Sequence, residues 1–268
     1  MIARLNASFL DAVTLAGVWF VTLCWYAGSL CLLLARAIGG ALSRPVRVQE
    51  ILQEAWMIGG RSLPIAFLAS FFIGMVLALQ SAYQMQKLSA EMYIAGLVSL
   101  SMIREIGPVM TALIVAGRVG SSIAAELGTM KVTEQIDALK ALGVSPVSFL
   151  VVPRFIALLI GLPVLTLWAD AVGVLGGFLI GTLKLNILPS LYWKMTTLPL
   201  VFKDLLSGLL KSVIFAMIIC IVSCFEGFRT EGGAEGVGRS TTAAVVSSFV
   251  LILSADCLLT AIFYFMWH

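Results

Sequence analysis

Long apolar runs separated by short polar connections set the organisation of this chain. Beyond residue 61, five runs are each long enough to cross a bilayer, which takes about 20 apolar residues in a helix. A helix suits such runs because it satisfies every backbone polar group internally. The pattern therefore predicts an all-α integral membrane protein with five transmembrane helices, at residues 62–85, 94–126, 147–183, 205–225 and 241–267.

The N-terminal part, 1–61, is expected to form an element of its own ahead of a membrane domain over 62–268. Its apolar run at 12–35 could span, but it is rich in Gly, Ser, Thr and Trp. It therefore also suits a helical element that lies in the interface or re-enters the membrane, and we expect one of these two. Residues 48–58 predict an amphipathic surface helix, whose apolar and acidic sides are formed by Ile51, Ala55, Ile58, Glu50 and Glu54.

The distribution of lysine and arginine among the connections predicts the orientation. Nine basic residues occur in three connections, at 36–61, 126–154 and 226–239. Five occur in the other two, at 87–104 and 184–203. Because Lys and Arg are enriched in cytoplasmic connections, the first three are expected in the cytoplasm and the C-terminus on the far side. Residues 186–199 and 226–240 are expected to be loops.

A polar, helix-favouring stretch at 130–142 lies between the second and third predicted spans. On a short helix its apolar positions share one face at three-residue spacing: Ile136, Leu139 and Leu142. A charged row lies beside them: Glu134, Asp137 and Lys140. Such a helix outside the lipid is a surface that a soluble partner could hold, so we predict a cytoplasmic coupling helix here.

Composition excludes several classes of function. A mean hydropathy of +1.06 with 12% charged residues rules out a soluble globular domain, and a net charge of +3 does not suggest nucleic-acid binding. The only histidine is His268 and no cysteine forms a Cys-x-x-Cys pair, so no metal site is expected. Neither a phosphate-binding Gly-x-x-x-x-Gly-Lys-Ser/Thr motif nor a catalytic triad is present. The chain is predicted to be no enzyme and to hold no cofactor, so any ATP must be bound by a partner.

Charged residues inside the predicted spans need partners, because unpaired charges in lipid are costly. Arg118 and Asp256 are predicted to form a buried, structural ion pair, while Asp170 has no assigned role. Arg104 and Glu105 precede Pro108 at a predicted helix break near the far face. They could contact a polar headgroup or form a solvated pair at the membrane boundary.

Several motifs then resemble the MlaE/YrbE permease family, the membrane subunits of ABC transporters linked to MCE proteins. These motifs are Arg104-Glu-Ile-Gly-Pro108, Ala116-Gly-Arg-Val-Gly-Ser121, Ala125-Glu-Leu-Gly128, Met130-Lys-Val-Thr-Glu-Gln135 and Pro153-Arg-Phe155. Phe72-Ile-Gly-Met-Val-Leu77 and Lys211-Ser-Val-Ile-Phe-Ala216 fit the same pattern. The similarity runs from about residue 60 to the C-terminus and is weak over the first 45 residues.

The resemblance implies a multi-pass homodimer in the bacterial inner membrane that moves phospholipid, or a related lipid, between that membrane and the outer envelope. It implies a cytoplasmic ABC ATPase dimer and a periplasmic ring of MCE-domain proteins, and it allows a small STAS-type accessory protein. The implied lipid-binding residues are Leu77, Gln84, Met85, Leu88, Arg104 and Glu105, with Gln84 a polar departure from the family. The implied ATPase-coupling residues are Met130, Lys131, Glu134, Gln135, Asp137 and Leu139.

Two other functions fit the residues. One is a secondary transporter or channel that is driven by an ion gradient, with Asp170 and Asp256 as proton sites. The other is a membrane scaffold without transport of its own. Transport by an ABC permease would depend on an ATPase, and transport by a secondary transporter would depend on a proton gradient. A scaffold would show neither dependence.

Overall fold

The computed structural model describes residues 2–43, 48–88 and 90–267, and every regular element in these ranges is helical. The elements in chain order are α1 (Ile2–Ser43), α2 (Val48–Gln86), η1 (Glu91–Tyr93), α3 (Ile94–Ser101), η2 (Met102–Ile106), α4 (Gly107–Val115), η3 (Ala116–Gly120), α5 (Ser121–Val132), α6 (Gln135–Ala141), η4 (Val147–Val151), α7 (Val152–Leu183), α8 (Pro189–Thr197), α9 (Phe202–Phe228) and α10 (Gly233–Trp267).

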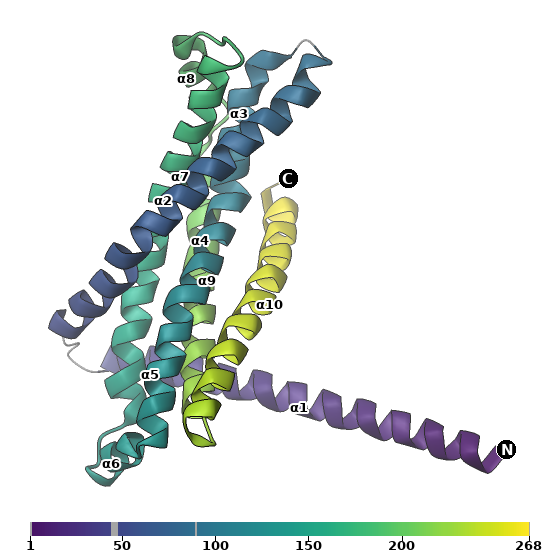
Figure 1. Cartoon of the computed structure of the whole chain (residues 1–268), viewed down its shortest axis with the longest axis vertical. Coiled ribbons are helices and arrows are strands. Elements are labelled where there is room, and N and C mark those ends of the chain that lie inside the picture. Colours follow the sequence, from purple (N-terminus) through teal and green to yellow (C-terminus); the bar gives the residue numbers. More distant parts are fainter. Residues whose placement is uncertain (1, 44–47, 89, 268) are drawn as a thin grey trace.

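Five long helical segments run along one bundle, and α1 lies crosswise at the α6 end (Figure 1). Within the described ranges six segments are long and apolar enough to cross a membrane, α1 among them. The crosswise position of α1 separates it from the other five. The prediction of an all-α, multi-pass membrane protein is therefore confirmed. The predicted boundary at residue 61 falls inside α2, which runs from Val48 to Gln86.

The inner half of α1 is fixed to the bundle. The Tyr26 hydroxyl donates a hydrogen bond of 2.8 Å to the Glu226 carboxylate on α9. Gly40 lies so close to the start of α7 that an added Cβ would be 2.8 Å from a Val152 methyl group. Apolar side chains elsewhere on α1 are exposed, including Phe20 and Leu32. Such exposure suits a helix that lies in the membrane interface.

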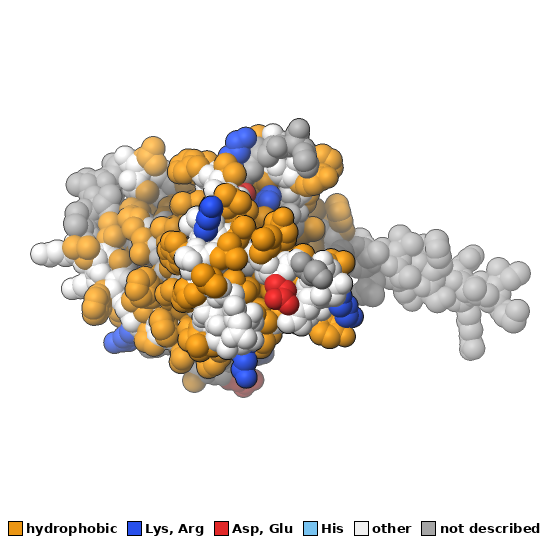
Figure 2. Space-filling view, turned by 90° about the horizontal axis from the view of Figure 1, so that it is seen from above, with side chains coloured by type: hydrophobic (Ala, Val, Ile, Leu, Met, Phe, Trp, Pro, Cys, Tyr) orange, Lys and Arg blue, Asp and Glu red, His pale blue; other side chains and the backbone are white. Residues whose placement is uncertain are grey.

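The surface of the bundle is predominantly apolar. Viewed from the α8 end, hydrophobic side chains cover most of the outline and basic groups are scattered singly among them (Figure 2). Large apolar side chains are exposed on every long helix, for example Phe72, Val164 and Leu253. A surface of this kind is stable in lipid rather than in water.

The predicted surface helix at 48–58 is not a separate element. It forms the first turns of α2, which continues without interruption past Pro64 to Gln86. Proline removes only one backbone donor. Ending the helix at this point would instead expose several unpaired backbone groups to lipid. Amphipathic periodicity alone does not reveal this continuity.

The predicted break at Pro108 takes the form of a π-helical turn. The path from α3 to α5 is nearly continuous, with π-helical turns at η2 and η3. Pro108 lies in the first turn of α4, directly after η2. One residue wound into a wider turn accommodates a proline without ending the helix. The helix thus continues past Pro108 in the same direction.

Both expected loops contain helical structure, so these predictions were wrong in extent. Residues 189–197 of the first form α8. Tyr192 on α8 is 1% exposed and packs edge-on against Phe178, and burial raises the pKa of Tyr192 to about 12. In the second, α9 extends to Phe228 and α10 begins at Gly233. A prediction based on polarity missed both the burial of Tyr192 and the continuation of α9 and α10 into the polar stretch.

Helices α2 and α7 meet along glycines that bring their backbones into contact. A Cβ added at Gly74 would lie 1.8 Å from the Gly173 carbonyl oxygen, and one added at Gly176 would lie 2.3 Å from the Phe71 carbonyl oxygen. Small residues at helix interfaces permit this close approach in membranes. We call Gly74, Gly173 and Gly176 the glycine seam.

Substitution of Gly74 by alanine is expected to destabilise the protein by about 3 kcal/mol, because overpacking against a backbone forces helices apart. The measurement is thermal unfolding of the detergent-solubilised protein. Gly59→Ala on the same helix is the control, since an added Cβ there meets nothing within 4 Å. Equal melting temperatures for the two variants would contradict the seam.

Candidate functional site

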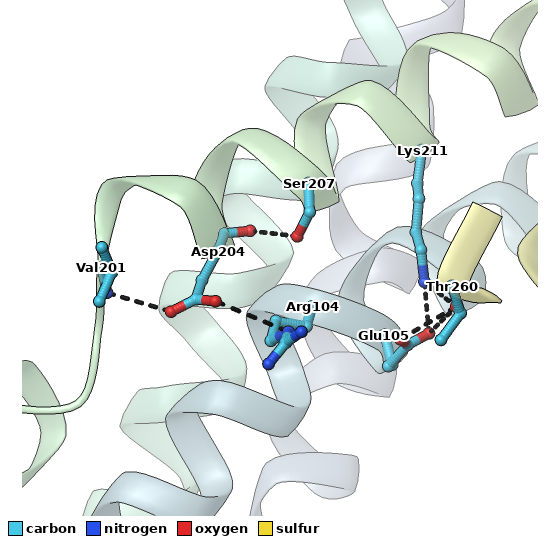
Figure 3. Close-up of polar contacts among 7 residues, drawn as sticks. All are labelled: Arg104, Glu105, Val201, Asp204, Ser207, Lys211 and Thr260. Carbon is cyan, nitrogen blue, oxygen red and sulfur yellow. Dashed lines mark hydrogen bonds and ion pairs between the residues drawn. The ribbon is translucent and has the colours of Figure 1, made fainter. Parts of the chain in front are cut away.

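A network of charged side chains crosses the α8-side half of the bundle, where η2 lies against α9 and α10 (Figure 3). Arg104 and Glu105 lie next to each other on η2. Each contacts a charge of opposite sign on α9: Arg104 contacts Asp204, and Glu105 contacts Lys211. These predicted headgroup-binding residues are therefore already engaged within the chain.

Lys211 is the centre of the network. Its side chain is 1% exposed, and its ammonium contacts the Glu105 carboxylate, Asp256 Oδ1 at 2.8 Å and Thr260 Oγ1 at 2.7 Å. Thr260 also donates to Glu105 Oε1 at 3.1 Å. A buried ammonium needs such partners, because its desolvation costs several kcal/mol. Two carboxylates share this one lysine, so three helical segments are joined at one point.

Arg104 and Asp204 form the outer part of the network. The Arg104 Nε lies 3.6 Å from Asp204 Oδ1. The other Asp204 oxygen accepts the Val201 backbone N–H at 3.0 Å, which caps the start of α9. The Arg104 and Glu105 side chains keep 41% and 40% exposure. The network is thus anchored in the protein on one side and offers a cation and a carboxylate on the other.

The predicted pair of Arg118 with Asp256 does not form. Asp256 pairs with Lys211, and the Arg118 guanidinium donates instead to the Ser62 hydroxyl at 3.3 Å. Asp256 lies at the level of Glu105, and residues 105 and 118 are separated by roughly 20 Å along a helix at 1.5 Å per residue. The level of a charge along the bundle, rather than its sign alone, decided the partner.

Three of the predicted lipid-binding residues, Leu77, Gln84 and Met85, lie in the last part of α2, and the fourth, Leu88, lies in the turn that follows α2. Leu77 and Met85 are half-buried against a small apolar core around Tyr192. Gln84 and Leu88 are exposed, Leu88 at 70%. All four precede the network in sequence and belong to the same half of the bundle (Figure 1). Their predicted role in lipid binding stays a prediction.

The predicted coupling segment, residues 130–142, folds as a helix end, a tight turn and a second helix. Met130 and Lys131 belong to the last turn of α5, and Gln135 begins α6. Glu134 joins them with a φ of +60°, in the left-handed region. Both Glu134 and Gln135 are exposed. The coupling helix is therefore shorter than the predicted 130–142 but lies at an outer end of the bundle.

The faces of α6 agree only in part with the prediction. Ile136 is 3% exposed and Leu139 packs on the same core, whereas Leu142 is 78% exposed because it follows the last helical residue. Asp137 accepts hydrogen bonds from Lys140 at 2.8 Å and Lys131 at 2.9 Å. These bonds lower the pKa of Asp137. Asp137 is thus held as a carboxylate between two lysines.

A second buried charge cluster lies behind the coupling segment. Arg154 on α7 contacts Glu126 on α5 at 2.7 Å and Glu54 on α2 at 3.4 Å, and donates to the Leu150 carbonyl at 2.9 Å. Its side chain is only 5% exposed. The cluster fixes the start of α7 to α2 and α5.

Sequence reasoning missed Lys211 and Asp204 as members of the network and Glu54 and Glu126 as partners of Arg154. Lys211 was noticed only as part of a motif. The available signal was its place in an apolar run, about two turns into the fourth predicted span, where a lone cation requires an acidic partner.

Comparison with known proteins decides the family. The model of the family described as "Permease MlaE" matches residues 51–262 of this chain. The chain belongs to the MlaE permease family. The match covers the charged network, the coupling segment and the Arg154 cluster. The match begins at residue 51 and so leaves out α1. The sequence resemblance is also weak over the first 45 residues.

MlaE-type relatives are found in bacteria and in a plant. A Rickettsia typhi protein named "Probable ABC transporter permease protein" is 47% identical over 85% of this chain and 88% of its own length. The Haemophilus influenzae protein named "Intermembrane phospholipid transport system permease protein MlaE" is 37% identical over 80% and 82%. The chloroplastic protein TRIGALACTOSYLDIACYLGLYCEROL 1 of Arabidopsis thaliana is 37% identical over 90% and 69%.

Proposed function

We propose that this chain is the membrane subunit of an ATP-driven transporter that moves phospholipid between the bacterial inner membrane and the outer envelope. Membership of the MlaE family and the name of the Haemophilus influenzae relative support the phospholipid. The names of the Rickettsia relatives support the ABC permease role. The chain would act as a homodimer, with a cytoplasmic ATPase dimer on one side and a periplasmic MCE-domain ring on the other.

The observation that carries this proposal is the half-exposed pair Arg104 and Glu105 in an otherwise apolar bundle. A phospholipid presents a charged headgroup and long acyl chains, so its site needs both kinds of surface. Arg104 would contact the phosphate, and Glu105 would contact a cationic or hydroxyl group beside it. Leu77 and Met85 on α2, and Leu88 in the turn after it, would contact the acyl chains.

ATP would act through the α5–α6 turn. An ATPase that holds Glu134 and Gln135 would move α6, and the short connection from α6 to η4 would pass that movement to α7 and Arg154. Transport becomes directional only when the two states of the protein bind lipid with different affinity. The charge contacts of Glu105 and Arg104 would then differ between the states.

Lipid retention and ATP-dependent transport test the proposal together. Leu88→Gln is expected to lower lipid retention and transport by on the order of tenfold, because a polar side chain loses the apolar contact of a leucine. Lipids are identified by mass spectrometry after gentle purification, and transport is measured in vesicles with and without the ATPase. Leu183→Gln, with 71% exposure at the end of α7, is the matched control. Unchanged transport in Leu88→Gln would contradict the site.

One observation favours ion-gradient transport as a second candidate. Asp170 is 6% exposed, and its Oδ1 has no hydrogen-bond partner among the described residues. It packs against Gly107, beside η2. Under this alternative, Asp170→Asn would abolish transport and a proton gradient would drive it without ATPase. The ABC proposal instead expects Asp170→Asn to keep ATP-dependent transport.

A further inference from the structure

A cavity of about 670 Å³ lies at the α6 end, where the C-terminal part of α1 meets α6 and the residues before η4. Three basic side chains line it: Arg36 from α1, Lys131 from α5 and Lys140 from α6. Arg104 and Glu105 belong to η2, which lies between α3 and α4 in the other half of the bundle (Figure 1). The cavity is therefore separate from the proposed transport site.

The charge of this cavity is only partly balanced. Asp137 pairs with Lys131 and Lys140. Within the part of the chain that the structure describes, no ion pair or hydrogen bond engages the Arg36 guanidinium. Ser145 and Ser148 add two hydroxyl groups to the lining. The cavity thus carries a net positive charge and further hydrogen-bond donors, which suits an anion such as a phosphate group.

The remaining wall is apolar. Ile136, Val147 and Phe228 line the same cavity. Arg36 extends from a helix that also exposes apolar side chains, such as Leu32 and Ile38, which suit the membrane interface. A phosphate joined to a glycerol and acyl chains would fill both parts of the cavity. A carboxylate on a protein partner would fill only the basic part.

We propose that this cavity binds the phosphate of an anionic phospholipid from the leaflet in which α1 lies. The bound headgroup would bridge Arg36 on α1 to the lysines beside the coupling segment. It would hold α1 and α6 together at the membrane surface. Basic pockets at the cytoplasmic ends of membrane helices commonly bind anionic lipids. The inference rests on the proposed placement of α6 at the cytoplasmic surface, but it requires neither ATP nor transport.

The test is lipid binding to the purified, delipidated full-length chain, followed by native mass spectrometry. The probes are phosphatidylglycerol and, as the neutral comparison, phosphatidylcholine. Arg36→Gln is expected to lower phosphatidylglycerol affinity about fivefold and Arg36→Glu about 25-fold, since each unit of charge near an anionic headgroup contributes about fivefold. The stoichiometry should fall by one phosphatidylglycerol per chain, with phosphatidylcholine binding unchanged.

Two control variants keep this result interpretable. Arg239→Gln removes an exposed arginine at the same end of the bundle, outside the cavity lining, and should bind phosphatidylglycerol as the parent does. Arg36→Lys keeps the charge and should restore most of the affinity, which separates lost charge from lost fold.

Three outcomes would overturn the proposal. One is unchanged phosphatidylglycerol binding in a folded Arg36→Glu variant. The second is displacement of the lipid by excess inorganic phosphate, which would assign the cavity to a free anion. The third is loss of ATPase docking in Arg36→Glu with lipid binding intact, which would assign it to the protein partner. Because binding is measured on the chain alone, failure of ATP coupling would leave this result unaffected.

Discussion

Replacing Lys211 with methionine is expected to lower the free energy of unfolding by about 3–5 kcal/mol, the usual cost of breaking a buried ion pair from one side. Methionine fills a similar volume but leaves Glu105 and Asp256 without their shared cation. Two carboxylates would then repel each other in apolar surroundings. Thermal unfolding of the detergent-solubilised protein measures the loss.

The same chain offers a control and a rescue for this prediction. Lys203→Met changes an exposed lysine on the same helix and should leave the melting temperature nearly unchanged. Adding Glu105→Gln and Asp256→Asn to Lys211→Met removes all three charges and should recover much of the stability, because no charge is then left unpaired. Full stability of the single variant Lys211→Met would refute a structural role for the network.

Reversing the charge of Glu134 is expected to cost about 2 kcal/mol or more of ATPase docking, about thirtyfold in Kd, as at the central contact of an interface. Glu134 is exposed at the turn between α5 and α6. Lysine in its place would repel any basic group that the ATPase presents there. Co-purification of the ATPase and ATP hydrolysis that depends on this chain measure the effect.

The backbone at Glu134 dictates the control for this experiment. Its φ of +60° is uncommon for most side chains but is tolerated by asparagine. Glu134→Asn therefore removes the charge while preserving the turn, and its effect should fall between the parent and Glu134→Lys. If the Glu134→Lys variant still supports full ATP hydrolysis, the ATPase binds another surface of this chain.

The spans were predictable because hydropathy reports directly on a bilayer. In lipid, the backbone N–H and C=O groups of an apolar run such as 205–225 must pair with each other, which a helix achieves. Helix α9 includes this run. The break at Pro108 was also visible, since proline has a fixed backbone requirement. Its outcome as a π-helical turn was not, because neighbouring helices decide how a helix accommodates proline.

The partners of the buried charges were not predictable in the same way. Lys211 and Arg118 are both lone cations in apolar runs, and the sequence gives their sign but not their height or face in the bundle. Those depend on where each helix starts and crosses its neighbours. Tyr192 shows the same limit: it lies in a stretch that was expected to be a loop, yet its side chain is buried in the core.

The glycine seam has a mechanical consequence. With carbonyl oxygens of one helix lying against the Cα atoms of the other at Gly74 and Gly176, α2 and α7 cannot slide or rotate past each other without a backbone clash. The two helices would therefore tilt as one rigid body. A displacement of the N-terminal end of α7 would then also displace Leu88, which follows α2 at the opposite end of the bundle, without a hinge between them.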